Sequence, residues 1–138
     1  MPYAGDLSPR EAWDLLEQDH DAVLVDVRTR AEWSYVGIPE LSSIGRNVVL
    51  IEWNTYPDGR RNADFVAQLE EVGAAPEAPV IFLCRSGQRS IGAAEAATAA
   101  GFSRAYNVLE GFEGPLDGER HRGGAGGWKV AGLPWRQS

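Results

Sequence analysis

Short apolar runs alternate with longer segments of mixed polarity along the chain. The short runs are rich in β-branched residues and predict buried strands. These runs cover residues 22–27, 47–51, 80–83 and 105–109. Apolar residues at helical spacing predict helices near 8–18, 30–33, 63–72 and 90–100. Strands that alternate with helices of about ten residues indicate an α/β fold, with a parallel sheet and helices on both faces.

Capping and terminating residues support these boundaries. Ser8-Pro9-Arg10-Glu11 is a capping-box pattern with proline at the first helical position. Gly73 and Gly101 follow predicted helices and are natural stops. The polar stretch 54–62 predicts a loop.

Beyond Gly111 the chain becomes rich in glycine. We expect residues 113–138 to form an irregular C-terminal wrap, anchored by Trp128, Leu133 and Trp135. Residues 1–138 are then one domain with its core in about 5–112, since 138 residues suffice for a single buried core.

The composition narrows the classes of function. Twenty acidic against 13 basic side chains give a net charge of −7, which argues against nucleic-acid and membrane-surface partners. A single cysteine cannot form an intrachain disulfide. The first residues lack the pattern of a signal peptide, and no apolar run reaches the roughly 20 residues of a membrane span. We therefore expect a soluble cytoplasmic protein.

That one cysteine, Cys84, lies where a predicted strand ends and a helix begins, in the loop Cys84-Arg85-Ser86-Gly87-Gln88-Arg89-Ser90. Backbone N–H groups at such a junction lack intrahelical partners and lie at the positive end of the helix dipole. Arg85 and Arg89 add positive charge. Each influence favours a thiolate over a thiol, so the loop is suited to a reactive sulfur anion.

The chain resembles the rhodanese-like sulfurtransferases over roughly residues 5–135. The matching motifs, in order along the chain, are Asp26-Val27-Arg28, Glu32-Trp33, Ile38-Pro39, the loop 84–90, Ala93, Gly101-Phe102 and Asn107-Val108-Leu109-Glu110-Gly111. The resemblance implies a sheet of about five parallel strands flanked by helices. It also implies that Cys84 carries a sulfane sulfur as a persulfide.

On this resemblance we expect an enzyme of the thiosulfate sulfurtransferase type. Cys84 would be the nucleophile, Arg85, Ser86, Gly87, Gln88, Arg89 and Ser90 the substrate-binding loop, and Asp26, Arg28 and Glu32 supporting residues. A small anionic sulfur donor and a thiol or cyanide acceptor would be the partners, with a protein acceptor as a further candidate. No cofactor or metal is required. The alternative is a non-enzymatic sulfur carrier or a regulatory binding module.

The length and sequence of the loop distinguish sulfur transfer from related cysteine-dependent activities. Cysteine-dependent phosphatases use a Cys-x5-Arg loop, whereas the arginine here, Arg89, stands at the fifth position. A shorter loop makes a narrower cradle, suited to one terminal sulfur rather than to a tetrahedral phosphate. Asp58 and Asp117 are the available general acids for phosphate chemistry. The loop matches neither the Cys-Arg-Lys-Gly-Val-Thr of two-domain thiosulfate enzymes nor the Cys-Gly-Ser-Gly-Val-Thr of mercaptopyruvate enzymes, so the donor stays open.

Structural roles are expected for several polar residues near the loop. Arg28 could be a substrate ligand, but we interpret Arg28 with Glu32 as an ion pair that braces the loop. Asp26 is interpreted as a capping or bracing carboxylate, not as a base. Ser90 is interpreted as a helix N-cap. One cysteine and two distant histidines give no metal-site spacing. Two tryptophans, Trp33 and Trp53, are candidates for the pocket wall and equally for the core.

Overall fold

Short strands and helices alternate along most of the chain, as the hydrophobic pattern predicts. The computed structural model describes residues 3–55, 59–85, 87–114 and 126–136. In chain order the elements are β1 (Gly5–Leu7), α1 (Pro9–Gln18), β2 (Val23–Asp26), α2 (Arg30–Tyr35), β3 (Ile38–Pro39), the 3-10 helix η1 (Ser42–Ile44), β4 (Val49–Leu50), α3 (Phe65–Glu71), β5 (Val80–Leu83), α4 (Arg89–Ala99), β6 (Ala105–Val108) and β7 (Trp135–Arg136).

A five-stranded sheet with the order β1-β6-β5-β2-β4 forms the centre of the molecule, and all its strand pairs are parallel. This confirms the predicted fold class. Its middle strand, β5, is buried along its whole length, which explains why its sequence is continuously apolar instead of alternating. In register, Asp26 lies opposite Leu83, so β2 and β5 end side by side. Cys84 follows at that carboxyl edge, where open α/β sheets bind their ligands.

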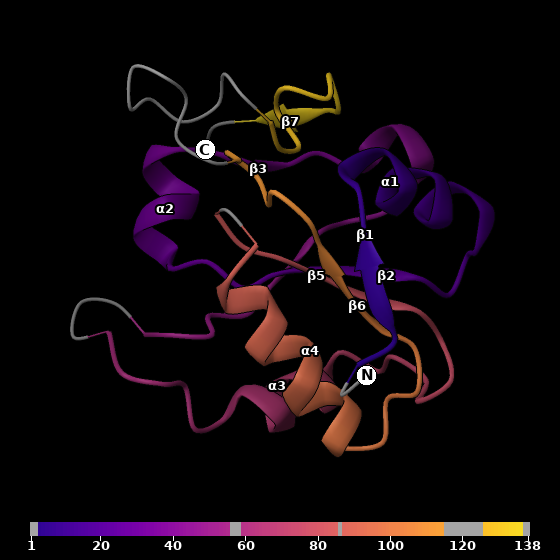
Figure 1. Cartoon of the computed structure of the whole chain (residues 1–138), viewed down its shortest axis with the longest axis vertical. Coiled ribbons are helices and arrows are strands. Elements are labelled where there is room, and N and C mark those ends of the chain that lie inside the picture. Colours follow the sequence, from indigo (N-terminus) through magenta and orange to yellow (C-terminus); the bar gives the residue numbers. More distant parts are fainter. Residues whose placement is uncertain (1–2, 56–58, 86, 115–125, 137–138) are drawn as a thin grey trace.

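Apolar side chains fill the space on both faces of the sheet. On one face α3 and α4 pack through Phe65, Leu69 and three alanines of α4. On the opposite face lie α1, through Leu16, and the C-terminal segment, through Trp128. Figure 1 shows α3 and α4 together on one side, with α1 on the other. Both faces are covered, as the parallel topology requires.

Three short strands, β1, β3 and β7, were not predicted from the sequence. β1 is only three residues long and carries a single large apolar side chain, yet it forms the sheet edge beside β6. β3 and β7 form a separate two-stranded antiparallel pair, Ile38 opposite Arg136. The C-terminal wrap is therefore not irregular throughout. Trp128 and Leu133 anchor it as expected, whereas Trp135 is 39% exposed.

Capping boxes start the first two helices. Ser8 and Glu11 form both reciprocal bonds of the predicted box at α1. Thr29 and Glu32 form a second box at α2, which follows directly on the end of β2. The Thr-x-x-Glu spacing is a sequence signal for this box, and it places Glu32 on the first turn of α2.

Candidate active site

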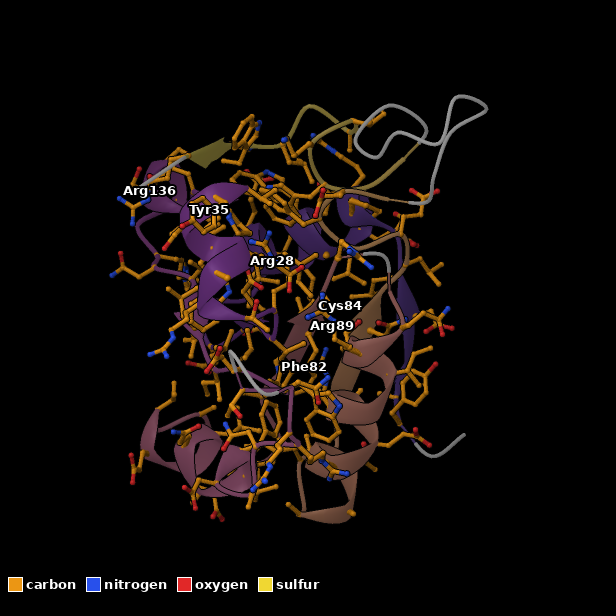
Figure 2. The ribbon with its side chains drawn as sticks, turned by 90° about the vertical axis from the view of Figure 1, so that its left-hand side faces the viewer. Arg28, Tyr35, Phe82, Cys84, Arg89 and Arg136 are labelled. Carbon is orange, nitrogen blue, oxygen red and sulfur yellow. The ribbon has the colours of Figure 1, made fainter. Side chains whose placement is uncertain are left out.

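Cys84 leaves β5 and is almost completely covered, with 1% of the residue exposed. Its Sγ accepts a hydrogen bond from the backbone N–H of Gly87 at 3.1 Å and lies 3.1 Å from Oγ of Ser90. Figure 2 shows Cys84 with Arg89 at the start of α4. Gly87 adopts φ +101°, a backbone conformation open mainly to glycine, and this turn directs its N–H at the sulfur. Ser86 lies outside the described residues.

The first turn of α4 differs from its prediction. The helix begins at Arg89, with Gln88 at the N-cap and no side-chain capping bond. Ser90 is therefore inside the helix, and the interpretation of Ser90 as the N-cap is wrong. Its buried hydroxyl instead faces Cys84 and Asn107, at 2.5 Å from Oδ1 of Asn107. Because α4 begins one residue earlier than predicted, the Ser90 side chain lies on the face of the helix that packs against the sheet.

A turn after β6 supports the cysteine loop from behind. The N–H of Phe112 donates to the carbonyl of Cys84 at 2.8 Å, and the N–H of Glu113 donates to the carbonyl of Arg85 at 2.9 Å. Gly111 lies so close that a Cβ there would collide with the carbonyl of Cys84 and approach Arg85 C to 2.6 Å. These backbone supports of the loop were not predicted. Their only sequence signal is the Glu-Gly pair that follows the last predicted strand.

Two ion pairs brace the site, with partners other than those predicted. Arg28 pairs with Asp26 at 2.6 Å, and both side chains are fully buried. The same guanidinium donates to the carbonyl of Gly37 at 2.6 Å and lies over the ring of Phe112 at 4.2 Å. The predicted pair of Arg28 with Glu32 is therefore wrong. Arg28 is only two residues from Asp26, and its guanidinium is occupied by that carboxylate. Glu32 therefore pairs with a different cation.

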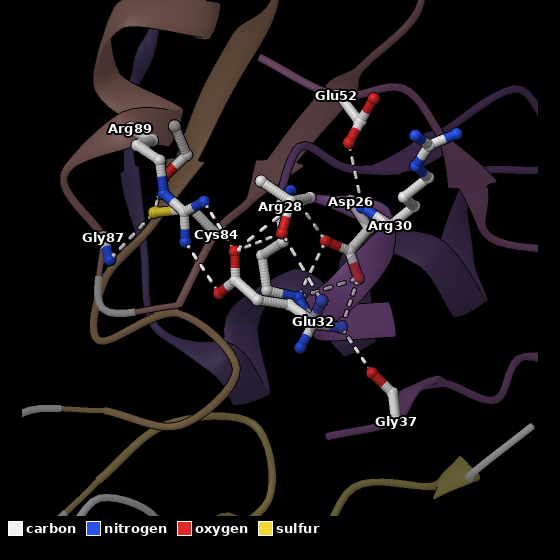
Figure 3. A network of polar contacts seen from close by, with 11 residues as sticks. Asp26, Arg28, Arg30, Glu32, Gly37, Glu52, Cys84, Gly87 and Arg89 are labelled. Carbon is white, nitrogen blue, oxygen red and sulfur yellow. Dashed lines mark hydrogen bonds and ion pairs between the residues drawn. The ribbon is translucent and has the colours of Figure 1, made fainter. Parts of the chain in front are cut away.

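That cation is Arg89, which binds Glu32 through two hydrogen bonds of 2.7 and 2.9 Å, as Figure 3 shows. Partial burial raises the pKa of Glu32, but the hydrogen bonds and charge of Arg89 outweigh it, and the pKa falls below its ordinary value. Burial likewise lowers the pKa of Arg89, and the bonds to Glu32 outweigh that effect and raise it. A thiolate at Cys84 would act on the pKa of Arg89 in the same direction. The Arg89 guanidinium therefore stays charged near the sulfur, while both of its terminal nitrogens are bound to Glu32.

The remaining loop side chains face solvent. Arg85 and Gln88 are exposed, and the Arg85 guanidinium has no partner among the described residues. Trp33 lines a cavity of about 480 Å³ together with Arg30, Ile51 and Asn62, and Cys84 is not among its lining residues. Trp53 is partly buried and packs against the core, with its ring centroid 5.0 Å from that of Phe65.

A third set of polar residues reaches the site from the edge of the sheet. Ser90 contacts Asn107 on β6, and Nδ2 of Asn107 donates to Asp6 on β1 at 3.1 Å. Asp6 also accepts a bond of 2.9 Å from the hydroxyl of Tyr3. No sequence signal connected Asp6 with Cys84, because β1 itself was not predicted.

Several negative observations apply to the described part of the chain. No group of three or more His, Cys, Asp or Glu side chains gathers there in a way that could hold a metal ion. Nor does any described helix have both the length and the apolar surface that crossing a bilayer demands. The two candidate general acids for phosphate chemistry, Asp58 and Asp117, lie outside the described residues.

This architecture matches a known family. The family model described as the STR4 middle domain matches residues 4–138, and the chain belongs to that family. The crystal structure of Rv0390 from M. tuberculosis is 60% identical in sequence and has a TM-score of 0.90, with 99% of both chains covered. The uncharacterized protein RC0915 of Rickettsia conorii is 39% identical over 126 residues, 91% of this chain and 92% of that protein.

More distant relatives carry a functional description. The polysulfide-sulfur transferase homodimer of Wolinella succinogenes has a TM-score of 0.64 and 25% identity, covering 96% of this chain and 78% of that one. Thiosulfate sulfurtransferase GlpE of Actinobacillus pleuropneumoniae is 27% identical over 129 residues, 94% of this chain and 90% of its own. Together these likenesses support a rhodanese-like fold and a function of the general sulfurtransferase type.

Proposed function

We propose that the protein is an enzyme that transfers a sulfane sulfur through a persulfide on Cys84. One observation carries the proposal: the sulfur lies at the start of α4 and accepts the Gly87 N–H, beside the charged guanidinium of Arg89. A helix N-terminus, a backbone donor and a nearby cation all favour negative charge on sulfur. They would stabilise the attacking thiolate and, after transfer, the persulfide anion.

The reaction has two half-reactions in which atoms and electrons balance. The Cys84 thiolate attacks the outer sulfur of thiosulfate, a new S–S bond forms, and sulfite leaves with the electron pair of the bond that breaks. A thiol or cyanide then attacks the outer sulfur of the persulfide. The acceptor gains that sulfur, and the Cys84 thiolate is restored. Two separate half-reactions predict ping-pong kinetics.

Charge around the loop favours a small anionic donor. Arg28 and Arg89 are each neutralised by a carboxylate, whereas Arg85 is exposed and has no partner among the described residues. Arg85 is therefore the side chain proposed to attract the donor. The near-complete burial of Cys84 also favours a donor that presents one terminal sulfur atom over a tetrahedral phosphate.

Mass spectrometry of the intact protein tests the proposal. Thiosulfate should add one sulfur atom to the wild-type protein, and cyanide should remove it. Cys84→Ser should gain no sulfur, because its hydroxyl cannot form a persulfide, while its near-equal size leaves the melting temperature almost unchanged. Sulfur gain by that variant would refute the assignment of Cys84.

Kinetics separate an enzyme from a sulfur carrier. An enzyme should produce many equivalents of thiocyanate from thiosulfate and cyanide, with parallel double-reciprocal plots. A carrier should take up one sulfur and release it without multiple turnover, and that result would contradict the proposed catalysis. The same turnover assay can be repeated with a protein acceptor in place of cyanide.

A further inference from the structure

The hydroxyl proton of Ser90 has a direction that its hydrogen-bond partners determine. Asp6 accepts hydrogen bonds from both the Asn107 amide and the Tyr3 hydroxyl. An ionised carboxylate can only accept, so the NH2 group of Asn107 must face Asp6. The carbonyl oxygen of Asn107 therefore faces Ser90. The donor and acceptor requirements of the neighbours thus determine the orientation of the amide.

The orientation of Asn107 also determines what the Ser90 hydroxyl presents to the sulfur of Cys84. The Asn107 carbonyl can only accept, so the Ser90 hydroxyl donates to it across 2.5 Å. A hydroxyl has one proton, and its oxygen therefore presents lone pairs to Cys84 Sγ at 3.1 Å. Such an oxygen can accept the proton of a thiol, but it cannot donate to a thiolate while it stays bound to Asn107. Burial of Ser90, Asn107 and Cys84 leaves little solvent to relax this arrangement.

We infer that Asp6 and Asn107 are positioning residues that hold the Ser90 hydroxyl away from the sulfur and so favour the protonated form of Cys84 in the resting protein. This opposes the Gly87 N–H, which favours the thiolate. When the sulfur becomes an anion, Ser90 must release Asn107 before it can donate to the sulfur. The inference rests on the proposed function only in taking Cys84 as the reactive group.

Other charged groups around Cys84 belong to separate contacts. Arg89 is bound to Glu32 of α2, and Arg28 to Asp26 at the end of β2. The described contacts of these four residues include neither Ser90 nor Asn107. The chain from Asp6 to Ser90 thus reaches the sulfur from the opposite, β1–β6, side of the site, and a change in Asp6 leaves both ion pairs in place.

Asp6→Asn is the decisive variant, because asparagine keeps the size of the exposed side chain and can also donate to Asn107. The amide of Asn107 is then free to turn, and Ser90 is free to donate to the sulfur. The pH midpoint of Cys84 alkylation by iodoacetamide should fall by about half to one unit, which is roughly three- to tenfold faster alkylation well below the midpoint. Thiolate absorbance in the ultraviolet should shift with it.

A matched control separates this effect from simple loss of charge. Glu95 is an exposed carboxylate of α4 that acts electrostatically on Tyr3, as Asp6 does, but it makes no described contact with Asn107. Glu95→Gln should move the midpoint by less than about 0.2 units, since solvent screens an exposed charge. An equal shift in Asp6→Asn and Glu95→Gln would overturn the inference.

Two further variants test the route through Ser90. Asn107→Leu removes the acceptor of the Ser90 hydroxyl and should lower the midpoint at least as far as Asp6→Asn. In a Ser90→Ala background, Asp6→Asn should have no more effect than Glu95→Gln. Ser90→Ala alone should not raise the midpoint; a rise would show that the hydroxyl already donates to the sulfur, and would sink the inference. Alkylation needs only a thiol, so these results are independent of whether sulfur is transferred.

Discussion

The Glu32–Arg89 ion pair should affect stability and cysteine reactivity in distinguishable ways. Glu32→Gln removes the carboxylate charge but keeps a side chain that can serve the capping box of α2, since glutamine also fits that position. Arg89→Gln removes the cation. Both single variants break the same pair of hydrogen bonds, at 2.7 and 2.9 Å. One variant removes a negative charge and the other a positive charge. Comparing them therefore separates loss of the ion pair from a change in charge near Cys84.

The stability effect follows from the geometry and exposure of the pair. Breaking a fully buried pair costs about 3–5 kcal/mol, whereas an exposed pair contributes about 0–1 kcal/mol. The Arg89 and Glu32 side chains are 23% and 20% exposed, which places this pair between the two cases. We expect each variant to lose about 2 kcal/mol at pH 7, or roughly 6–10 °C in melting temperature. Asp14→Asn, which breaks the exposed pair with Arg10, should cost less than about 0.5 kcal/mol.

The pH dependence of this loss has a defined sign. Folding lowers the pKa of Glu32 from its ordinary value of 4.5, so the pair stabilises the fold fully above that pH. The contribution disappears as the pH falls through the lower pKa of the folded state. Denaturant titrations should therefore show wild type and Glu32→Gln converging below about pH 4 and separated at pH 7. A constant difference across that range would contradict the assigned pKa shift.

Cys84 alkylation supplies the opposing readout. Glu32→Gln leaves an unpaired cation near the sulfur and should speed alkylation at neutral pH. Arg89→Gln leaves an unpaired anion and should slow it. If the pair acted only by holding the loop in shape, both variants would change the rate in the same direction. Rates that move together in the two variants would thus refute electrostatic activation by Arg89.

Four other outcomes follow from the site. Arg85→Ala should raise the KM for thiosulfate by roughly two- to fivefold, as one exposed charge–charge contact is lost, while Cys84 alkylation changes little; steady-state kinetics checks this. Gly111→Ala should destabilise the protein by at least about 2 kcal/mol in denaturant melts, because φ is +61° and the added methyl meets the cysteine loop. Asp26→Asn should cost about 3–5 kcal/mol, since buried Arg28 loses its counter-ion; thermal melts of Asp14→Asn give the comparison. Aryl phosphate should not be turned over, and Cys84-dependent release of phosphate would disprove the narrow-loop argument.

Local sequence signals were sufficient for most of the fold. The apolar runs predicted four of the five sheet strands, and the capping residues and glycines bounded the helices to within a few residues. These signals are local, because a strand buried on both faces must be apolar throughout and a helix must satisfy its first N–H groups nearby. The position of Cys84 between β5 and α4 was predicted on the same grounds and is confirmed. β1 and the β3–β7 pair were missed, since strands of two or three residues carry too little periodicity to detect.

Pairing of side chains was decided by the tertiary structure alone. The sequence predicted an ion pair between Arg28 and Glu32, four residues apart. In the structure Arg28 pairs with Asp26 instead. Glu32 pairs with Arg89, which is 57 residues away in the sequence. A long side chain binds whichever opposite charge the packed elements bring within reach, and sequence distance does not contain that information. The same holds for Asp6, which reaches the site only because β1 lies beside β6. The sequence alone thus determined that Cys84 lies between a strand and a helix, and the tertiary structure determined which distant side chains lie around it.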